Sequence, residues 1–169
     1  MSKPALVLLD VAVWLGVHVT IGLCAHRWPL QSLLREKWVT RIRAWEDDGR
    51  VWQRVARVRS WKRRLPEAGA AFAGGFDKSS IGGRSVQALE RYAAETRRAE
   101  LSHWVVMAAA PFFALWNPWY AAVAMLVYGV AVNVPCIISQ RYNRARILRL
   151  LRRRAAASPP ASPASPASE

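Results

Sequence analysis

The segment LSHWVVMAAAPFFALWNPWYAAVAMLVYGVAVNVPCIIS, residues 101–139, decides the fold. It holds two apolar blocks, 101–116 and 119–139, and the dipeptide between them, Asn117-Pro118, favours a turn. The later block is long enough to cross a hydrocarbon core of about 30 Å, whereas the earlier one is short for a span and either tilts little or is re-entrant. We therefore expect a helical hairpin whose tip carries an interfacial aromatic belt of Trp116, Trp119 and Tyr120.

Another apolar block occupies residues 4–25, and its 22 residues are also long enough to span. Its only preceding charge is Lys3 and no clear A-x-A site follows, so a retained anchor is favoured over a cleaved signal peptide. The block contains Asp10 and His18, and polar groups inside a membrane are functional candidates. We expect Asp10 near the outer interface, in contact with water. The fold class predicted is an all-α membrane protein with about three apolar membrane helices, one N-terminal and then a helical hairpin, plus amphipathic interfacial cytoplasmic helices.

The charge distribution predicts the orientation. The net charge is +14; of the 25 Lys and Arg residues, 17 lie between Arg27 and Arg98 and 7 between Arg141 and Arg154, with none at the hairpin tip. The positive-inside rule then places both basic regions in the cytoplasm and the N-terminus outside, in a multi-pass protein of the cell membrane. Such a charge indicates an acidic partner, either anionic membrane lipid or a phosphate-bearing substrate. Nucleic acid ranks last because no nucleic-acid motif is present.

Four regions are expected: an N-terminal membrane anchor (1–26), a basic Trp-rich cytoplasmic region (27–84), a signature helix and membrane hairpin with a basic C-terminal helix (85–154), and a disordered Pro/Ser/Ala tail (155–169). Apolar residues at spacings of three and four predict two amphipathic helices in the cytoplasmic region, separated by Asp47-Asp48-Gly49. Their apolar positions are Leu34, Trp38, Ile42 and Trp45, then Trp52, Val55, Val58 and Trp61. Interleaved arginines favour helices lying against anionic lipid, with an ordinary packed helix pair as the alternative. The glycine-rich connector, residues 69–85, contains no phosphate-binding loop.

A helix is predicted to begin near Ser85 and to continue into the apolar block through ETRRAELSHW, residues 95–104. At 100° per residue, His103 projects between two carboxylates, about 80° from Glu95 and about 60° from Glu100. A neighbouring carboxylate fixes the tautomer of an imidazole and makes it more basic, so His103 is a candidate general base toward a hydroxyl. On periodicity alone, charges that merely mark the end of a span are the simpler interpretation.

A second polar cluster, NVPCIISQRYNRARI, covers residues 133–147, and the hairpin would bring it beside His103. Two facing polar clusters suit a lipid substrate with a polar head, and their donors suit a developing oxyanion. We predict a catalytic set of His103, Glu100 and Glu95 and a substrate-binding set of Arg98, Asn133, Gln140, Arg141, Tyr142, Asn143 and Arg144. No cofactor and no metal site are predicted, and neither cysteine belongs to a CxxC pair. With no G-x-S-x-G elbow in the chain, acyl transfer would proceed by direct attack of the hydroxyl, without a serine acyl-enzyme.

The two polar clusters resemble the signature segments of the glycosyl-4,4'-diaponeurosporenoate acyltransferase family, ET-x-RAEL-x-HW and N-x-P-x-II-x-QRYNR-x-R. The matching positions are Glu95, Thr96, Arg98, Ala99, Glu100, Leu101, His103 and Trp104, then Asn133, Pro135, Ile137, Ile138, Gln140, Arg141, Tyr142, Asn143, Arg144 and Arg146; Trp61-Lys62 also fits. The resemblance extends from about Trp45 to Leu151. It implies a small, basic, membrane-bound enzyme of the last step of staphyloxanthin synthesis, in which a fatty acyl group esterifies the glucose 6-hydroxyl of a glycosylated carotenoid acid.

The partners that the resemblance implies are a glycosylated carotenoid or glycolipid acceptor and an acyl-CoA or acyl-carrier donor. A family member can keep acyl transfer and accept another glycolipid. The alternative interpretation is a non-catalytic membrane adaptor that recruits lipid or carotenoid biosynthetic enzymes through its tryptophan-rich helices. The two differ in whether His103 is needed for acylated glycolipid to form.

Overall fold

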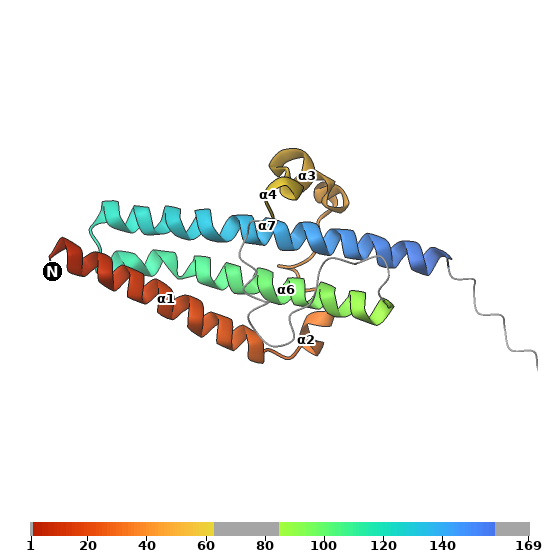
Figure 1. The fold of residues 1–169 in the computed structure, drawn as a ribbon, viewed down its shortest axis with the longest axis horizontal. Helices are drawn as coiled ribbons and strands as arrows, with labels where there is room; N and C mark the ends of the chain where they lie inside the picture. Colours follow the sequence, from red (N-terminus) through yellow and green to blue (C-terminus); the bar gives the residue numbers. More distant parts are fainter. Residues whose placement is uncertain (1, 63–84, 158–169) are drawn as a thin grey trace, which may run out of the picture.

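The computed structural model describes residues 2–62 and 85–157. The glycine-rich connector up to residue 84 and the tail beyond Ala157 lie outside these ranges. The described residues form helices and no strand, as the all-α prediction requires. Three long helices run side by side, and short helical segments lie on either side of them (Figure 1).

The hairpin consists of α6 (Val86–Ala108), the 3-10 helix η3 (Ala110–Leu115) and α7 (Trp119–Ala157). The α6 helix begins where expected, because the Ser85 hydroxyl caps it by accepting the Ala88 amide at 3.2 Å. Pro111 lies in the first turn of η3 and has no amide hydrogen to continue the α6 ladder. The earlier apolar block is therefore divided between the end of α6 and η3.

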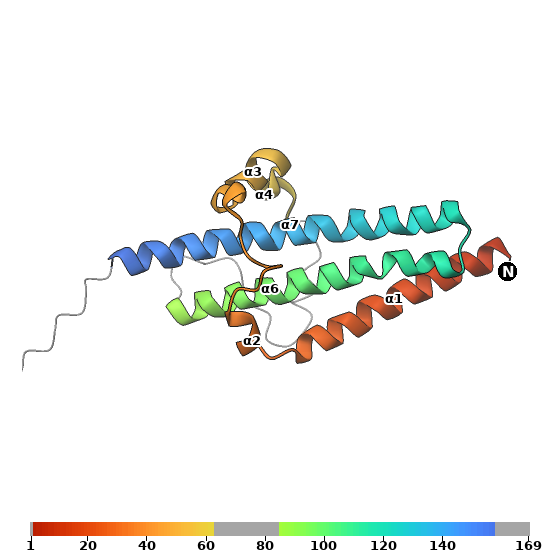
Figure 2. The ribbon, with the colours of Figure 1, turned by 180° about the vertical axis from the view of Figure 1, so that it is seen from behind.

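Helix α1 (Lys3–Arg27) packs against α6, as Figures 1 and 2 both show. Its Trp14 joins Val106, Ala110 and Phe113 in a buried apolar core close to the hairpin tip. Gly129 of α7 makes this packing possible, because a Cβ there would lie 2.9 Å from the Ala110 Cβ and 3.3 Å from the Trp14 ring. The Ala110 methyl group and the Trp14 ring together leave too little room for a side chain at this position.

Two of these helices, α1 and α7, are long and apolar enough to cross a membrane. Only 11% and 17% of their most apolar windows are buried, whereas the core helix of a water-soluble protein would be mostly buried. About three apolar membrane helices were predicted, and two of the described helices are long and apolar enough. The α6 helix is not, because it carries apolar sequence only over its last two turns.

Asp10 differs from its expected position in water. Asp10 is 6% exposed, and its carboxylate accepts hydrogen bonds from the Trp116 indole and the Asn117 amide, each at 2.8 Å. Both donors belong to the hairpin tip, so Asp10 fastens the beginning of α1 to that tip. Hydrogen bonds to the charged form offset part of the cost of burying the carboxylate.

The basic region differs more from its prediction. A helix over residues 34–45 is wrong: α2 (Gln31–Leu34) is one turn long, and residues 35–43, which we call the crossing segment, are non-helical apart from a turn. The crossing segment leads from α2, beside α6, to η1 (Ala44–Gly49), α3 (Arg50–Ala56) and α4 (Val58–Trp61), beside α7 (Figures 1 and 2). Its carbonyl groups bind arginines of α7, and a helix would have used those carbonyls internally.

The break predicted at Asp47-Asp48-Gly49 is confirmed, because all three residues have positive φ. A second break follows at Arg57, whose φ of 45° separates α3 from α4. The helix expected to continue past Arg146 is present and extends to Ala157, so it includes the first residues of the predicted tail.

Candidate functional site

A histidine and an asparagine meet between the two legs of the hairpin. His103 Nδ1 lies 2.9 Å from Asn133 Oδ1. The Asn133 amide nitrogen donates to the Gly129 carbonyl at 2.8 Å, which identifies Oδ1 as the atom facing the ring. An amide oxygen only accepts hydrogen bonds, so Nδ1 of the neutral imidazole carries the proton and Nε2 keeps its lone pair. The arrangement presents His103 Nε2 as a proton acceptor.

This pair lies beside the apolar core, one turn from Val106. His103 is half-buried and Asn133 is 1% exposed. Within residues 2–62 and 85–157, Nε2 of His103 has no hydrogen-bond partner. Apolar surroundings strengthen the hydrogen bond that fixes the tautomer, because little water competes for it.

A buried ion network lies next to the pair, one turn before His103 on α6. Glu46 and Glu100 are both fully buried, and Arg141 bridges them: its Nη1 donates to Glu100 at 2.5 Å and its Nε to Glu46 at 3.0 Å. Arg144, also fully buried, donates to the other oxygen of Glu100. Two carboxylates and two guanidinium groups balance in charge, which is the condition under which ions tolerate burial.

The same two arginines hold the crossing segment. Arg141 donates to the carbonyls of Val39 and Arg41 at 3.3 and 2.8 Å, and Arg144 donates to the carbonyl of Thr40 at 2.7 Å. Each of these three consecutive carbonyl groups thus accepts a hydrogen bond from a charged guanidinium group. The network therefore links α6, α7 and the basic region into one unit.

Glu46 has several donors besides Arg141. The Arg43 amide and the Trp52 indole each donate to it at 2.7 Å. Burial by itself raises the pKa of the Glu46 carboxyl, but the hydrogen bonds from Arg141, Arg43 and Trp52 outweigh burial, so this pKa lies below its ordinary value. Glu46 is thus held as a carboxylate.

The remaining charged residues of 95–104 attach other elements to α6. Arg98 donates to both oxygens of Glu95, at 3.0 and 3.2 Å, and to the Trp28 carbonyl at 2.8 Å, which fastens the end of α1. Arg97 is buried and donates to the carbonyls of the last two residues of α2 at 2.9 and 3.1 Å. The carboxylates expected beside His103 therefore have arginine partners, and Asn133 occupies the place beside the ring.

Residues 140–143 of the second cluster differ in their hydrogen-bond partners. The Tyr142 hydroxyl accepts from Arg59 Nε, and Asn143 Oδ1 accepts from Lys62 Nζ, each at 2.8 Å, so both residues attach α4 to α7. The Gln140 amide has no hydrogen-bond partner in the part of the chain that the structure describes. Gln140 lies two turns from Asn133 on nearly the same face of α7.

The model of the glycosyl-4,4'-diaponeurosporenoate acyltransferase family matches residues 35–153, from the crossing segment to the end of α7. The chain belongs to this family. Similar proteins of that name occur in Staphylococcus haemolyticus (strain JCSC1435), 28% identical over 140 residues, and in Staphylococcus aureus (strain USA300), 30% identical over 140 residues. The alignments cover 83% and 82% of this chain and 81% and 84% of the relatives. No solved structure matches.

Membership makes this protein an acyltransferase, which favours the enzyme over the adaptor interpretation. In this acyltransferase the two signature segments meet at two places: the His103–Asn133 pair, and the ion network of Glu100 with Arg141 and Arg144. Sequence reasoning missed Glu46 as a member of that network. The signal for it was the excess of charge, because two arginines at the end of an apolar helix require more than the single carboxylate of Glu100.

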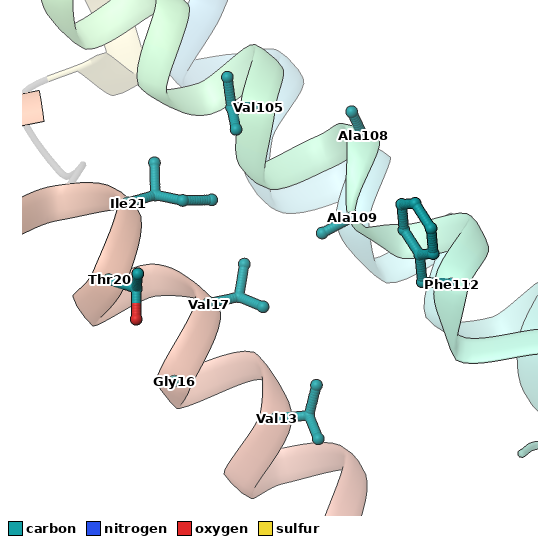
Figure 3. Close-up of a pocket in the computed structure, with 9 residues that line it drawn as sticks. All are labelled: Val13, Gly16, Val17, Thr20, Ile21, Val105, Ala108, Ala109 and Phe112. Atoms are coloured by element: carbon teal, nitrogen blue, oxygen red, sulfur yellow. The ribbon is translucent and has the colours of Figure 1, made fainter. Parts of the chain in front are cut away.

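The acyltransferase also has an apolar groove between α1 and α6, with a volume of about 480 Å³ (Figure 3). Val13, Val17 and Ile21 point into it from α1, opposite Ala109, the residue that follows α6. Val105, which also lines it, and His103 lie about 160° apart around α6. The groove therefore lies on the opposite side of α6 from the imidazole.

Proposed function

We propose that this protein is an integral-membrane O-acyltransferase that esterifies a sugar hydroxyl of a glycosylated carotenoid, or of a related glycolipid, with a fatty acyl group. Family membership supports acyl transfer, and the relatives' name supplies the acceptor class. The observation that carries the proposal is the chain of contacts from the Gly129 carbonyl through Asn133 to His103 Nδ1, because it leaves Nε2 as a base.

The chemistry needs one base and no covalent enzyme intermediate. His103 Nε2 accepts the proton of the sugar hydroxyl while the hydroxyl oxygen attacks the carbonyl carbon of an acyl thioester. The tetrahedral intermediate then expels the thiolate of the acyl-CoA or acyl-carrier donor, and the imidazolium returns its proton to that thiolate. One ester bond forms, one thioester bond breaks, and His103 ends neutral. We assign the free amide of Gln140 to the acyl or sugar oxygen.

The helix rise gives these groups a depth. From Trp119 to Asn133 the axial distance is about 21 Å, and from Trp119 to Arg141 it is about 33 Å. With the hairpin tip at the outer interface, the ion network lies at the inner interface and the His103–Asn133 pair lies inside the hydrocarbon core, whose thickness is about 30 Å. This placement agrees with the charge distribution, so the basic regions are assigned to the cytoplasm and the N-terminus to the outside.

The cytoplasmic surface suits anionic partners. Lys62 Nζ and the Arg146 guanidinium lie 5.1 and 5.7 Å from the centre of the Tyr142 ring, and Arg59 contacts its hydroxyl. We assign this cluster to the phosphate groups of acyl-CoA or of an acyl carrier. Trp38 and Trp45, which are 77% and 61% exposed, are assigned to the headgroup layer of anionic lipid.

The roles of the predicted site residues are refined accordingly. His103 is the catalytic base and Asn133 its positioning residue. Three guanidinium groups expected on the substrate, those of Arg98, Arg141 and Arg144, are assigned to holding the fold around it. Glu95 and Glu100 are assigned to those arginines rather than to the ring.

The test is a lipid profile of cells that make a glycosylated carotenoid together with the wild-type chain, with His103→Ala or with His26→Ala. His26 is an exposed histidine in the last turn of α1 and serves as the matched control. We expect acylated product with wild type and His26→Ala, and a loss of about 10²- to 10⁴-fold with His103→Ala. An unchanged amount of acylated glycolipid with His103→Ala, at equal protein level, contradicts the proposal.

A further inference from the structure

A second imidazole lies near His103. His18 belongs to α1, where Trp14 packs against Gly129 of α7. His18 follows Trp14 by four residues, and Asn133 follows Gly129 by four residues. Because both helices run away from the hairpin tip, His18 lies at the level of the His103–Asn133 pair. His18 follows Trp14 by one turn and lies only about 40° from it around the helix. Because Trp14 enters the core between α6 and α7, His18 faces the same side of the bundle as that core.

The tautomer of His18 is also fixed by a hydrogen bond. Its Nδ1 lies 2.8 Å from the Trp14 carbonyl oxygen, which can only accept. In the neutral ring, Nδ1 therefore carries the proton and Nε2 carries the lone pair. No other hydrogen bond to His18 occurs in the described parts of the chain. His18 and His103 thus each have an Nε2 atom that can accept a hydrogen bond.

The chemistry of two such acceptors limits the ligand. Both lone pairs repel an anion, and an ammonium ion in apolar surroundings loses more hydration than two neutral acceptors return. A zinc ion requires three or four protein ligands, and the described residues contain no group of three or more His, Cys, Asp or Glu side chains that could hold a metal. An uncharged group with two neighbouring O–H donors is complementary to both nitrogens.

We infer that His18 is a second residue that binds the sugar of the acyl acceptor. Its Nε2 accepts a hydrogen bond from a sugar hydroxyl next to the one that His103 deprotonates. The inference rests on the proposed function and extends it: the acceptor is recognised as a polyol head through two hydroxyl groups held by two helices. His18 binds the sugar and takes no proton in the transfer. Its removal therefore weakens acceptor binding and leaves the chemical step in place.

The experiment measures transfer in membranes by wild type, His18→Phe, His18→Gln and the control His26→Phe. The acceptors are the glucosylated carotenoid acid and analogues in which one sugar hydroxyl is replaced by hydrogen. We expect His18→Phe to raise the KM for the natural acceptor about 3- to 10-fold, the range of one neutral hydrogen bond, with kcat and the donor KM unchanged. His18→Gln, which keeps an acceptor oxygen, restores part of the loss, and His26→Phe behaves as wild type.

The analogues provide the decisive comparison. With wild type, one analogue has a KM raised about 3- to 10-fold, and with His18→Phe that same analogue is used as well as the natural acceptor. Equal acceptor KM values for wild type and His18→Phe, or an equal penalty for that analogue in both proteins, overturn the inference. Failure of the proposed function looks different, because wild type then transfers nothing. Binding of the acceptor, followed by quenching of tryptophan fluorescence in wild type and His18→Phe, tests His18 in that case, and equal affinities overturn the inference.

Discussion

The fully buried carboxylate of Glu100 gives the sharpest test of the ion network. Arg141 Nη1 and Arg144 donate to its two oxygens, and the Trp104 indole approaches Oε1 at 3.5 Å. Glu100→Gln keeps the shape but removes the charge, so the network is left with two buried guanidinium groups and the carboxylate of Glu46 alone. Breaking a buried pair in this way costs about 3–5 kcal/mol. For a chain of this length, that loss lowers Tm by about 6–20 °C.

Glu95→Gln is the matched control, because it makes the same chemical change on the same helix. The side chains of Glu95 and Arg98 are 31% and 17% exposed, so solvent weakens their interaction and its loss costs about 0–1 kcal/mol. Thermal unfolding in detergent, followed by tryptophan fluorescence, measures both variants beside wild type. Equal Tm values for the two variants refute the assignment of the network as the main support of this end of the bundle. A Glu100→Gln protein with wild-type Tm and no turnover would instead place that carboxylate in the chemistry.

Three further predictions follow from the packing, the tautomer and the pKa of Glu46. Gly129→Ala should lower the free energy of unfolding by about 1–3 kcal/mol, because the new methyl group would lie 2.9 Å from the Ala110 Cβ. Gly22→Ala meets nothing within 4 Å and should raise the free energy of unfolding by about 0.5–1 kcal/mol. Thermal unfolding of both variants measures the two changes. Asn133→Leu should keep a folded protein and lower kcat about 10²- to 10⁴-fold, since the ring of His103 loses the acceptor that fixes its tautomer; turnover at a matched folded fraction checks it. The pKa of Glu46 is lower in the folded than in the unfolded chain, so its contribution to stability is complete above the ordinary carboxyl value and is lost as pH falls through the lowered value; Tm against pH should flatten over that range in Glu46→Gln.

Periodicity and capping chemistry were sufficient for the long helices. Ser85 opens α6, Asn117-Pro118 turns the chain, and the apolar run after Trp119 becomes α7. The crossing segment was not predictable in the same way, because the spacing of Trp38, Ile42 and Trp45 satisfies a helical period that the backbone does not adopt. Its conformation depends on hydrogen bonds from Arg141 and Arg144, about 100 residues later in the chain, and tertiary bonds of this kind override local preference.

The candidate site shows the same division. The hairpin and the helical period place His103 and Asn133 at one level, so their contact follows from local pattern. The partners of Glu95 and Glu100 do not follow, because angular separation on one helix says nothing about which long arginine side chain arrives from another. His18 was visible as a polar group within an apolar block, but only the packing of Trp14 of α1 against Gly129 of α7 brings it to the level of His103.

The way Arg141 and Arg144 hold the crossing segment has an evolutionary consequence. The guanidinium groups bind backbone carbonyl oxygens, so these bonds do not depend on the side chains of the residues bound. The side chains of Val39 and Arg41 are exposed. Exposed positions of this segment are therefore expected to accept many substitutions, whereas Thr40, which is 1% exposed, is not. Deletion of a single residue would bring different oxygens to the two arginines and move Glu46 out of reach, so deletions are expected to be rare throughout the segment.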